Sequence, residues 1–280
     1  RYKGPEMARV MSFVMAVFIL VPVIAPSIGQ VILIFFNWEA IFWMFLITAL
    51  LVCIWFSIRL DETLLPESRQ PLSFRKIRNG MIEVLKTRTA LGYTLATGFL
   101  FSPFVGYLSS SQQIFADGYG KKDEFPLLFA SLALTFGVAS LVNARLVYRY
   151  GLKRLCFASV SVITGLSSIF LLGILGMDKI PPLWLFMGYM MIIFPGIGFL
   201  FGNLNALAME PLGHIAGVGA AMIGSLSSLI SIPLGILIAG AFNGTVLPLI
   251  TGFFLCGLAV LFSIIWAEKN PQSKVVVENP

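Results

Sequence analysis

Charge and histidine are scarce in this sequence. Only 11% of its 280 residues are Asp, Glu, Lys or Arg, whereas about 25% is usual in soluble domains. A water-exposed surface needs more charge than this, so an ordinary soluble globule is excluded. The single histidine, His214, argues against a histidine-based metal centre and against a Ser/His/Asp triad, so we predict no metal site and no catalytic residues.

Cysteines are few and widely spaced. Cys53, Cys156 and Cys256 each lie inside an apolar run, far from the other two. A thiol in such surroundings stays neutral and lacks a nearby partner, so we interpret all three as small packing residues. The acidic residues are scattered as well, which argues against a membrane-embedded enzyme.

Long apolar runs dominate what is present, since 58% of the residues are hydrophobic. An α-helix needs about 20 residues to cross a bilayer core of roughly 30 Å. Eight runs satisfy this length, namely residues 9–36, 40–58, 90–115, 125–147, 155–176, 183–207, 215–240 and 245–267. The sequence therefore predicts an all-α integral membrane protein with eight transmembrane helices.

The basic residues between these runs predict the orientation. Sixteen of the 19 Lys and Arg residues fall on one side of the predicted membrane, and Lys121, Lys122 and Lys179 fall on the other. Basic loops stay in the cytoplasm, so both visible ends are predicted to be cytoplasmic. An even number of spans agrees, because it brings both ends to the same side.

The loop 59–89 divides the chain into two spans and six. We expect residues 1–58 to hold two helices, 90–267 to hold six, and 268–280 to form a cytoplasmic tail. In the loop, apolar residues recur with helical spacing, and basic residues occupy the remaining positions. The apolar residues are Phe74, Ile77, Met81, Ile82 and Leu85, and the basic residues are Arg75, Lys76, Arg78, Lys86 and Arg88. This pattern predicts a basic amphipathic helix along the inner leaflet; a solvated charged linker is the alternative.

Polar residues inside the runs are candidate substrate contacts, because unpaired amides and hydroxyls are costly in lipid. We select Tyr107, Ser110, Gln113, Asn203 and Asn205. The alternative for a serine is a bond to its own helix carbonyl, and for Asn203 it is a bond to a neighbouring helix. No carboxylate falls at mid-depth, so an acid that couples transport to protons is not expected among these residues.

Two stretches resemble motifs of a known transporter family. In the first run the sequence reads Pro22-Val23-Ile24-Ala25-Pro26-Ser27-Ile28-Gly29-Gln30, similar to the Gly-Pro-x-x-Gly antiporter motif of a fifth helix, with Ala25 replacing its first glycine. The second stretch is Ala144 to Arg154, which resembles the G-x-L-x-D-R-x-G-R-K-R loop between helices eight and nine. That loop motif is matched by Leu146, Arg149, Gly151, Lys153 and Arg154, while Ala144, Tyr148 and Leu152 depart from it.

Both motifs belong to the major facilitator superfamily, and within it the chain resembles the Bcr/CflA-type drug:proton antiporters. The resemblance implies that the visible spans are helices five to twelve of twelve, a partial fold of two plus six helices. The antiporter motif would then include Pro22, Ala25, Pro26 and Gly29. The acid of the loop motif is replaced by Tyr148, and helices one to four, which carry the coupling residues in the family, would be absent.

The function implied by the resemblance is secondary active export of small amphipathic compounds in exchange for protons, by alternating access. Such a protein needs no cofactor and uses the proton gradient as its energy source. Its partners would be drug-like small molecules and the lipid bilayer of the bacterial inner membrane, not nucleic acid, and it would be a monomer when full length. The alternative is a truncated or non-transporting membrane subunit.

Overall fold

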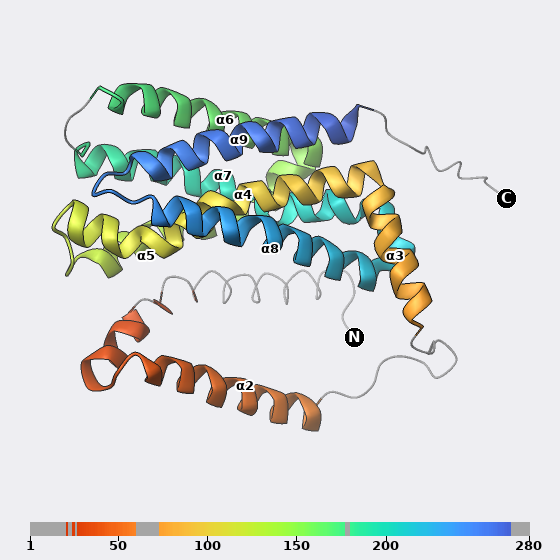
Figure 1. The fold of residues 1–280 in the computed structure, drawn as a ribbon, viewed down its shortest axis with the longest axis horizontal. Coiled ribbons are helices and arrows are strands. Elements are labelled where there is room, and N and C mark those ends of the chain that lie inside the picture. The colour runs from red at the N-terminus through yellow and green to blue at the C-terminus, as the bar shows by residue number, and fades with distance from the viewer. Residues whose placement is uncertain (1–20, 22–23, 26, 60–72, 177–179, 270–280) are drawn as a thin grey trace.

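The computed structural model describes residues 21, 24–25, 27–59, 73–176 and 180–269, and every regular element in them is a helix. Residues 27–35 form part of the first helix. The elements that follow are α2 (Glu39–Arg59), α3 (Phe74–Lys86), α4 (Arg88–Gln113), η2 (Ile114–Gly118), α5 (Phe125–Tyr150), α6 (Leu152–Ile174), α7 (Leu183–Met209), η3 (Glu210–Ile215), α8 (Ala216–Gly240) and α9 (Leu247–Glu268) (Figure 1).

The helices follow the apolar runs closely. Six stretches of the described residues are long and apolar enough to cross a membrane. One of them, Leu183–Gly240, contains both α7 and α8, which the short turn η3 joins. The all-α membrane fold is therefore confirmed, and the first predicted run, 9–36, lies only partly within the described residues.

Helices α4 to α9 form one bundle with α4 at its centre. α4 packs against α7, α8 and α9, and α6 packs against α7 and α9. In Figure 1, α6 and α9 lie side by side on one face of the bundle, and α2 lies beyond the opposite face. Apolar side chains fill the core, and its largest fully buried members include Tyr93, Phe186, Met190 and Phe253.

Glycines allow α4 and α8 to approach closely. A Cβ on Gly235 of α8 would lie 2.6 Å from Cγ1 of Val105, and one on Gly106 of α4 would lie 2.8 Å from Cγ2 of Ile238. Small residues permit such close backbone contact, which supplies much of the attraction between membrane helices. The two glycines therefore fix the spacing between α4 and α8.

The two ends of the bundle differ. α3 runs across the end at which α4 begins, as Figure 1 shows, and because the spans alternate in direction, the α5–α6 loop, η3 and the end of α9 lie there too. We call this the α3 end, and η2 marks the opposite end. α3 starts at Ser73, whose side chain accepts a hydrogen bond from the Lys76 backbone.

α2 stands apart from this bundle. None of its 21 residues is buried by the rest of the described chain. An apolar helix of this kind is stable only in lipid or against other membrane helices. The division into a two-helix part and a six-helix part stays a prediction.

Candidate functional site

An aromatic cluster joins α4, α5 and α7. Ring centroids lie 5.1 Å apart for Phe101 and Phe201, 6.2 Å for Phe104 and Phe136, and 5.8 Å for Phe104 and Phe194. We call this cluster the aromatic wall, and its members are Phe101, Phe104, Tyr107, Phe129, Phe136, Phe194 and Phe201. Most of these contacts are edge-to-face, the arrangement that aromatic pairs prefer.

The wall has a buried base and an accessible rim. Phe194 is 3% exposed, whereas Phe201 is 37% exposed and the other phenylalanines of the wall are half-buried. Leu108, one turn along α4 from Phe104, is 45% exposed and extends the apolar rim. A bulky apolar molecule placed against this rim would contact several aromatic side chains at once.

Tyr107 supplies a polar atom at the base of the wall. Its ring stacks on Phe129 and meets Phe194 edge-on, with centroids 5.9 and 5.1 Å apart. The side chain is fully buried, and its hydroxyl has no hydrogen-bond partner among the described residues. A buried hydroxyl without a partner is costly, so a polar partner brought to this atom would stabilise the bundle.

The other predicted polar contacts on α4 and α7 lie in different surroundings. Ser110 is buried, and its hydroxyl donates to the Gly106 carbonyl of its own helix at 2.8 Å. This is the bond that the sequence analysis gave as the alternative to substrate contact for a serine. Asn205 likewise donates to the Phe201 carbonyl at 3.0 Å. Gln113 is exposed at the last position of α4.

Asn203 pairs with an amide that the sequence analysis did not select. Its Nδ2 donates to Oδ1 of Asn143 at 2.8 Å, and Asn143 Nδ2 donates back to Asn203 Oδ1 at 3.0 Å. Asn203 is only 5% exposed. The pair thus ties α5 to α7. A substrate-binding role for the five selected residues stays a prediction.

The antiporter-motif residues that the structure describes face α2. Ala25 and Gly29 line a groove of about 340 Å³ between the first helix and α2. Ile41, Met44 and Phe45 of α2 line the other side of this groove. The other two predicted motif residues, Pro22 and Pro26, lie outside the described residues. The described part of the motif therefore lines an apolar groove.

The conformational loop motif lies at the α3 end. Gly151 joins α5 to α6 with φ +82° and ψ 151°, a backbone conformation almost restricted to glycine. Arg149 lies 5.4 Å from the centroid of the Tyr150 ring, Leu146 is half-buried, and Arg154 is exposed. The turn therefore depends on glycine, while the basic residues around it stay accessible.

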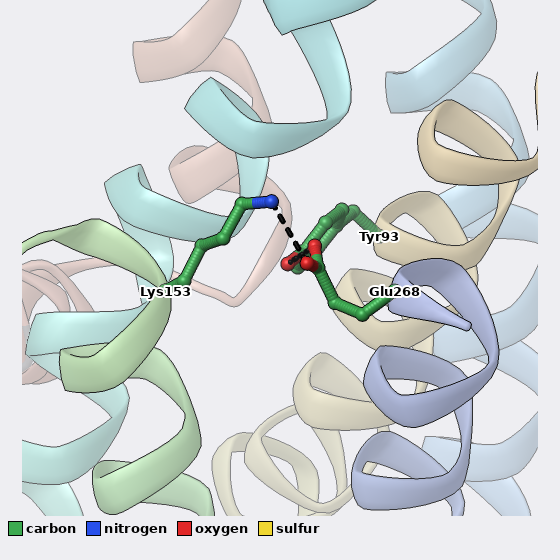
Figure 2. Close-up of polar contacts among 3 residues, drawn as sticks. All are labelled: Tyr93, Lys153 and Glu268. Atoms are coloured by element: carbon green, nitrogen blue, oxygen red, sulfur yellow. Dashed lines mark hydrogen bonds and ion pairs between the residues drawn. The ribbon is translucent and has the colours of Figure 1, made fainter. Parts of the chain in front are cut away.

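Lys153 of this motif connects three helices through Glu268. Its Nζ lies 2.8 Å from Glu268 Oε2 at the end of α9, and the Tyr93 hydroxyl of α4 donates to Glu268 Oε1 at 2.7 Å. Figure 2 shows both side chains reaching the same carboxylate. The loop motif is thus linked to α4, the helix that carries Phe101 and Phe104.

Sequence reasoning missed Glu268 and Asn143. Both carried a usable signal, since Glu268 is an acid directly after an apolar run on the basic side, and Asn143 is an amide inside a run. Neither signal names a partner, because the partners lie 115 and 60 residues away along the chain.

Comparison with known proteins identifies the family. The sequence profile of the Major Facilitator Superfamily matches residues 1–232. The chain belongs to this superfamily. The resemblance drawn from the two motifs is confirmed, and because the superfamily consists of membrane transporters, the chain is a multi-pass membrane protein and not an enzyme.

Several curated proteins of the superfamily are similar to the chain. The Bicyclomycin resistance protein homolog of Haemophilus influenzae is 27% identical over 272 residues, covering 94% of this chain and 65% of the relative. The uncharacterized MFS-type transporter YdgK of Bacillus subtilis is 29% identical over 82% of this chain and 57% of its own length. Multidrug resistance protein MdtL of Shewanella oneidensis is 25% identical over 97% of this chain and 67% of its own length. The chain spans between 57% and 67% of the length of these relatives.

Proposed function

We propose that the protein is a secondary transporter that exports small amphipathic compounds across the bacterial inner membrane in exchange for protons. The aromatic wall is the observation that carries this proposal. Superfamily membership supports transport, and the names of two relatives, a bicyclomycin resistance protein homolog and a multidrug resistance protein, support drug-like substrates.

The wall suits substrates of varied shape. Its phenylalanine rings offer apolar surface without fixed hydrogen-bond geometry, so burial supplies most of the affinity and many bulky molecules fit. The buried Tyr107 hydroxyl adds one directional contact for a substrate that carries a polar group. A site with one polar point and many aromatic faces favours amphipathic compounds over ions or sugars.

Alternating access in this proposal uses the α3 end. The Lys153–Glu268–Tyr93 contacts hold α6, α9 and α4 together there, and breaking or forming them changes how the bundle end packs. The proton gradient supplies the energy. Because the carboxylates of this sequence fall near the ends of the spans, we place the proton-coupling acid outside them. We also propose cytoplasmic ends and a monomer.

A drug panel with the complete gene tests the proposal. Cells lacking their own exporters would express the protein, Phe104→Leu, or the control Phe262→Leu, whose side chain is 71% exposed on α9 away from the wall. We expect the parent to lower drug accumulation, Phe104→Leu to change the drug profile unevenly, and Phe262→Leu to match the parent. No drug efflux by the parent, or equal profiles for both variants, would contradict the proposal.

A further inference from the structure

α3 carries three distinct faces. Gly80 and Val84 are buried, and a Cβ on Gly80 would lie 3.1 Å from Val218 of α8. Phe74, Met81 and Leu85 lie on a second face, because positions seven and four residues apart return to the same side of a helix. They are 83%, 40% and 46% exposed. Arg75, Arg78 and Lys86 lie on the third face, which also carries the 40% exposed Ile82.

The apolar face lies between the buried face and the basic face. At 100° for each residue, the sequence of faces around α3 runs from Gly80 and Val84 through Phe74, Met81 and Leu85 to the basic side chains. Arg75, Arg78 and Lys86 are exposed, and none of them has an interaction partner among the described residues. The basic face is thus available to an anionic partner directly beside exposed apolar side chains.

Contacts with the bundle hold α3 in this orientation. Glu83 Oε1 lies 2.7 Å from His214 Nε2 of η3, on the side of α3 that faces away from Arg78. At the C-terminal end of α3, Thr87 donates through its hydroxyl to the Glu83 carbonyl at 2.8 Å and joins α3 to α4. The helix therefore cannot roll its apolar face onto the bundle without breaking the Glu83–His214 contact.

The residues next to the end of α3 are of the kinds found at a membrane interface. Arg88, two residues after α3, places its guanidinium 4.9 Å from the centroid of the Trp266 ring and donates from Nε to the Trp266 carbonyl at 2.7 Å. Tryptophan and arginine gather where the hydrocarbon meets the headgroups. α3 runs across the bundle at this end (Figure 1), which is the orientation of a helix that lies along a bilayer surface.

We propose that α3 is a binding surface for anionic phospholipid. Phe74, Met81 and Leu85 enter the upper part of the acyl chains, and Arg75, Arg78 and Lys86 contact the headgroup phosphates directly above them. The bilayer arranges these two chemistries side by side in the same order as α3 does, and basic residues close to such a surface each add attraction. Since α3 continues into α4, the central helix of the bundle, and packs on α8, bound lipid acts on both of these helices.

Quenching by brominated lipid tests the proposal. The three native cysteines would be replaced by alanine. A fluorophore would then be attached to a cysteine introduced by Phe74→Cys, at a position where the native side chain is 83% exposed. Leu85→Cys provides a second probe position on the same face. The purified chain would be placed in phosphatidylethanolamine nanodiscs with a small, equal share of brominated phosphatidylglycerol or brominated phosphatidylcholine. The measured quantity is the ratio of quenching by the two brominated lipids.

We expect phosphatidylglycerol to quench more strongly, and a label at Asn79→Cys on the basic side to be quenched little. R75Q/R78Q should lower the ratio by up to about 25-fold, since each basic residue near an anionic surface contributes about fivefold. K121Q/K122Q, which removes the same charge at the opposite end, and R75K/R78K should keep it. Equal quenching by both lipids in the parent, no quenching at either probe position, or an unchanged ratio in R75Q/R78Q would overturn the proposal.

Discussion

The Asn143–Asn203 pair gives a quantitative prediction about how α5 and α7 are joined. Each amide donates one hydrogen bond to the other, at 2.8 and 3.0 Å. A hydrogen bond between membrane helices contributes about 0.6 kcal/mol on average, so the two together should give a coupling free energy of about 1.2 kcal/mol. Asn143→Ala and Asn203→Ala each remove both hydrogen bonds. The loss of unfolding free energy in the double variant should therefore be about 1.2 kcal/mol smaller than the sum of the losses in the two single variants.

Reversible unfolding of the purified chain in mixed detergent and SDS micelles measures these free energies. Asn205 provides the matched control, because its side chain bonds its own helix and the Asn143→Ala/Asn205→Ala pair should be additive. Unconnected sites add within about 0.5 kcal/mol, so the expected coupling is resolvable. A coupling for Asn143 and Asn203 no larger than that of the control would refute the pairing and would restore Asn203 as a free amide available to substrate.

Three further predictions concern topology and packing. Reporter fusions should read as cytoplasmic at Arg78 and Lys153 and as external at Lys121, and an external signal at Arg78 would contradict the orientation drawn from the basic loops. Gly151→Val should reduce transport by the full-length protein while membrane insertion persists, because the backbone conformation of Gly151 costs a non-glycine residue about 1–3 kcal/mol. Gly173→Val is the control, since Gly173 has open space around it. Normal transport by Gly151→Val at normal expression would disprove the role of the loop. Gly235→Leu should lower the free energy of unfolding by about 1–3 kcal/mol, because the new side chain overpacks against Val105. Gly224→Leu should leave this free energy unchanged, because Gly224 has no neighbour within 4 Å. Equal effects of the two substitutions would show that the α4–α8 contact is looser than described.

The helices could be predicted because the bilayer imposes one length on all of them. The run 125–147 corresponds to α5, Phe125–Tyr150, and the run 183–207 to α7, Leu183–Met209. The first turn of α3 could also be predicted, since Ser73 precedes an amphipathic pattern and caps the helix. These are local properties that hydropathy and spacing encode.

The site was harder to predict because hydropathy says nothing about how each helix is rotated about its axis. Asn203 and Asn205 are two residues apart in the same apolar run, yet Asn203 meets Asn143 and Asn205 bonds its own helix. The sequence marks Tyr107 as a polar residue in an apolar run, but it gives no signal that sets its phenylalanine neighbours apart from the other apolar residues. Only the packing of α4, α5 and α7 brings those rings together and gives the tyrosine its surroundings.

Photolabelling of the full-length protein tests most directly whether the aromatic wall binds substrate. A photoreactive aryl derivative of an exported drug would be bound, activated by light, and located by mass spectrometry of the labelled peptides. We expect labels on α4, α5 and α7 near Phe101, Phe104 and Phe136, and we expect an excess of the parent drug to remove them. Labels spread equally over the outer faces of α6 and α9, near Phe157 and Phe262, and insensitive to competing drug would show that the compound only dissolves in the surrounding lipid and that the wall is not the binding site.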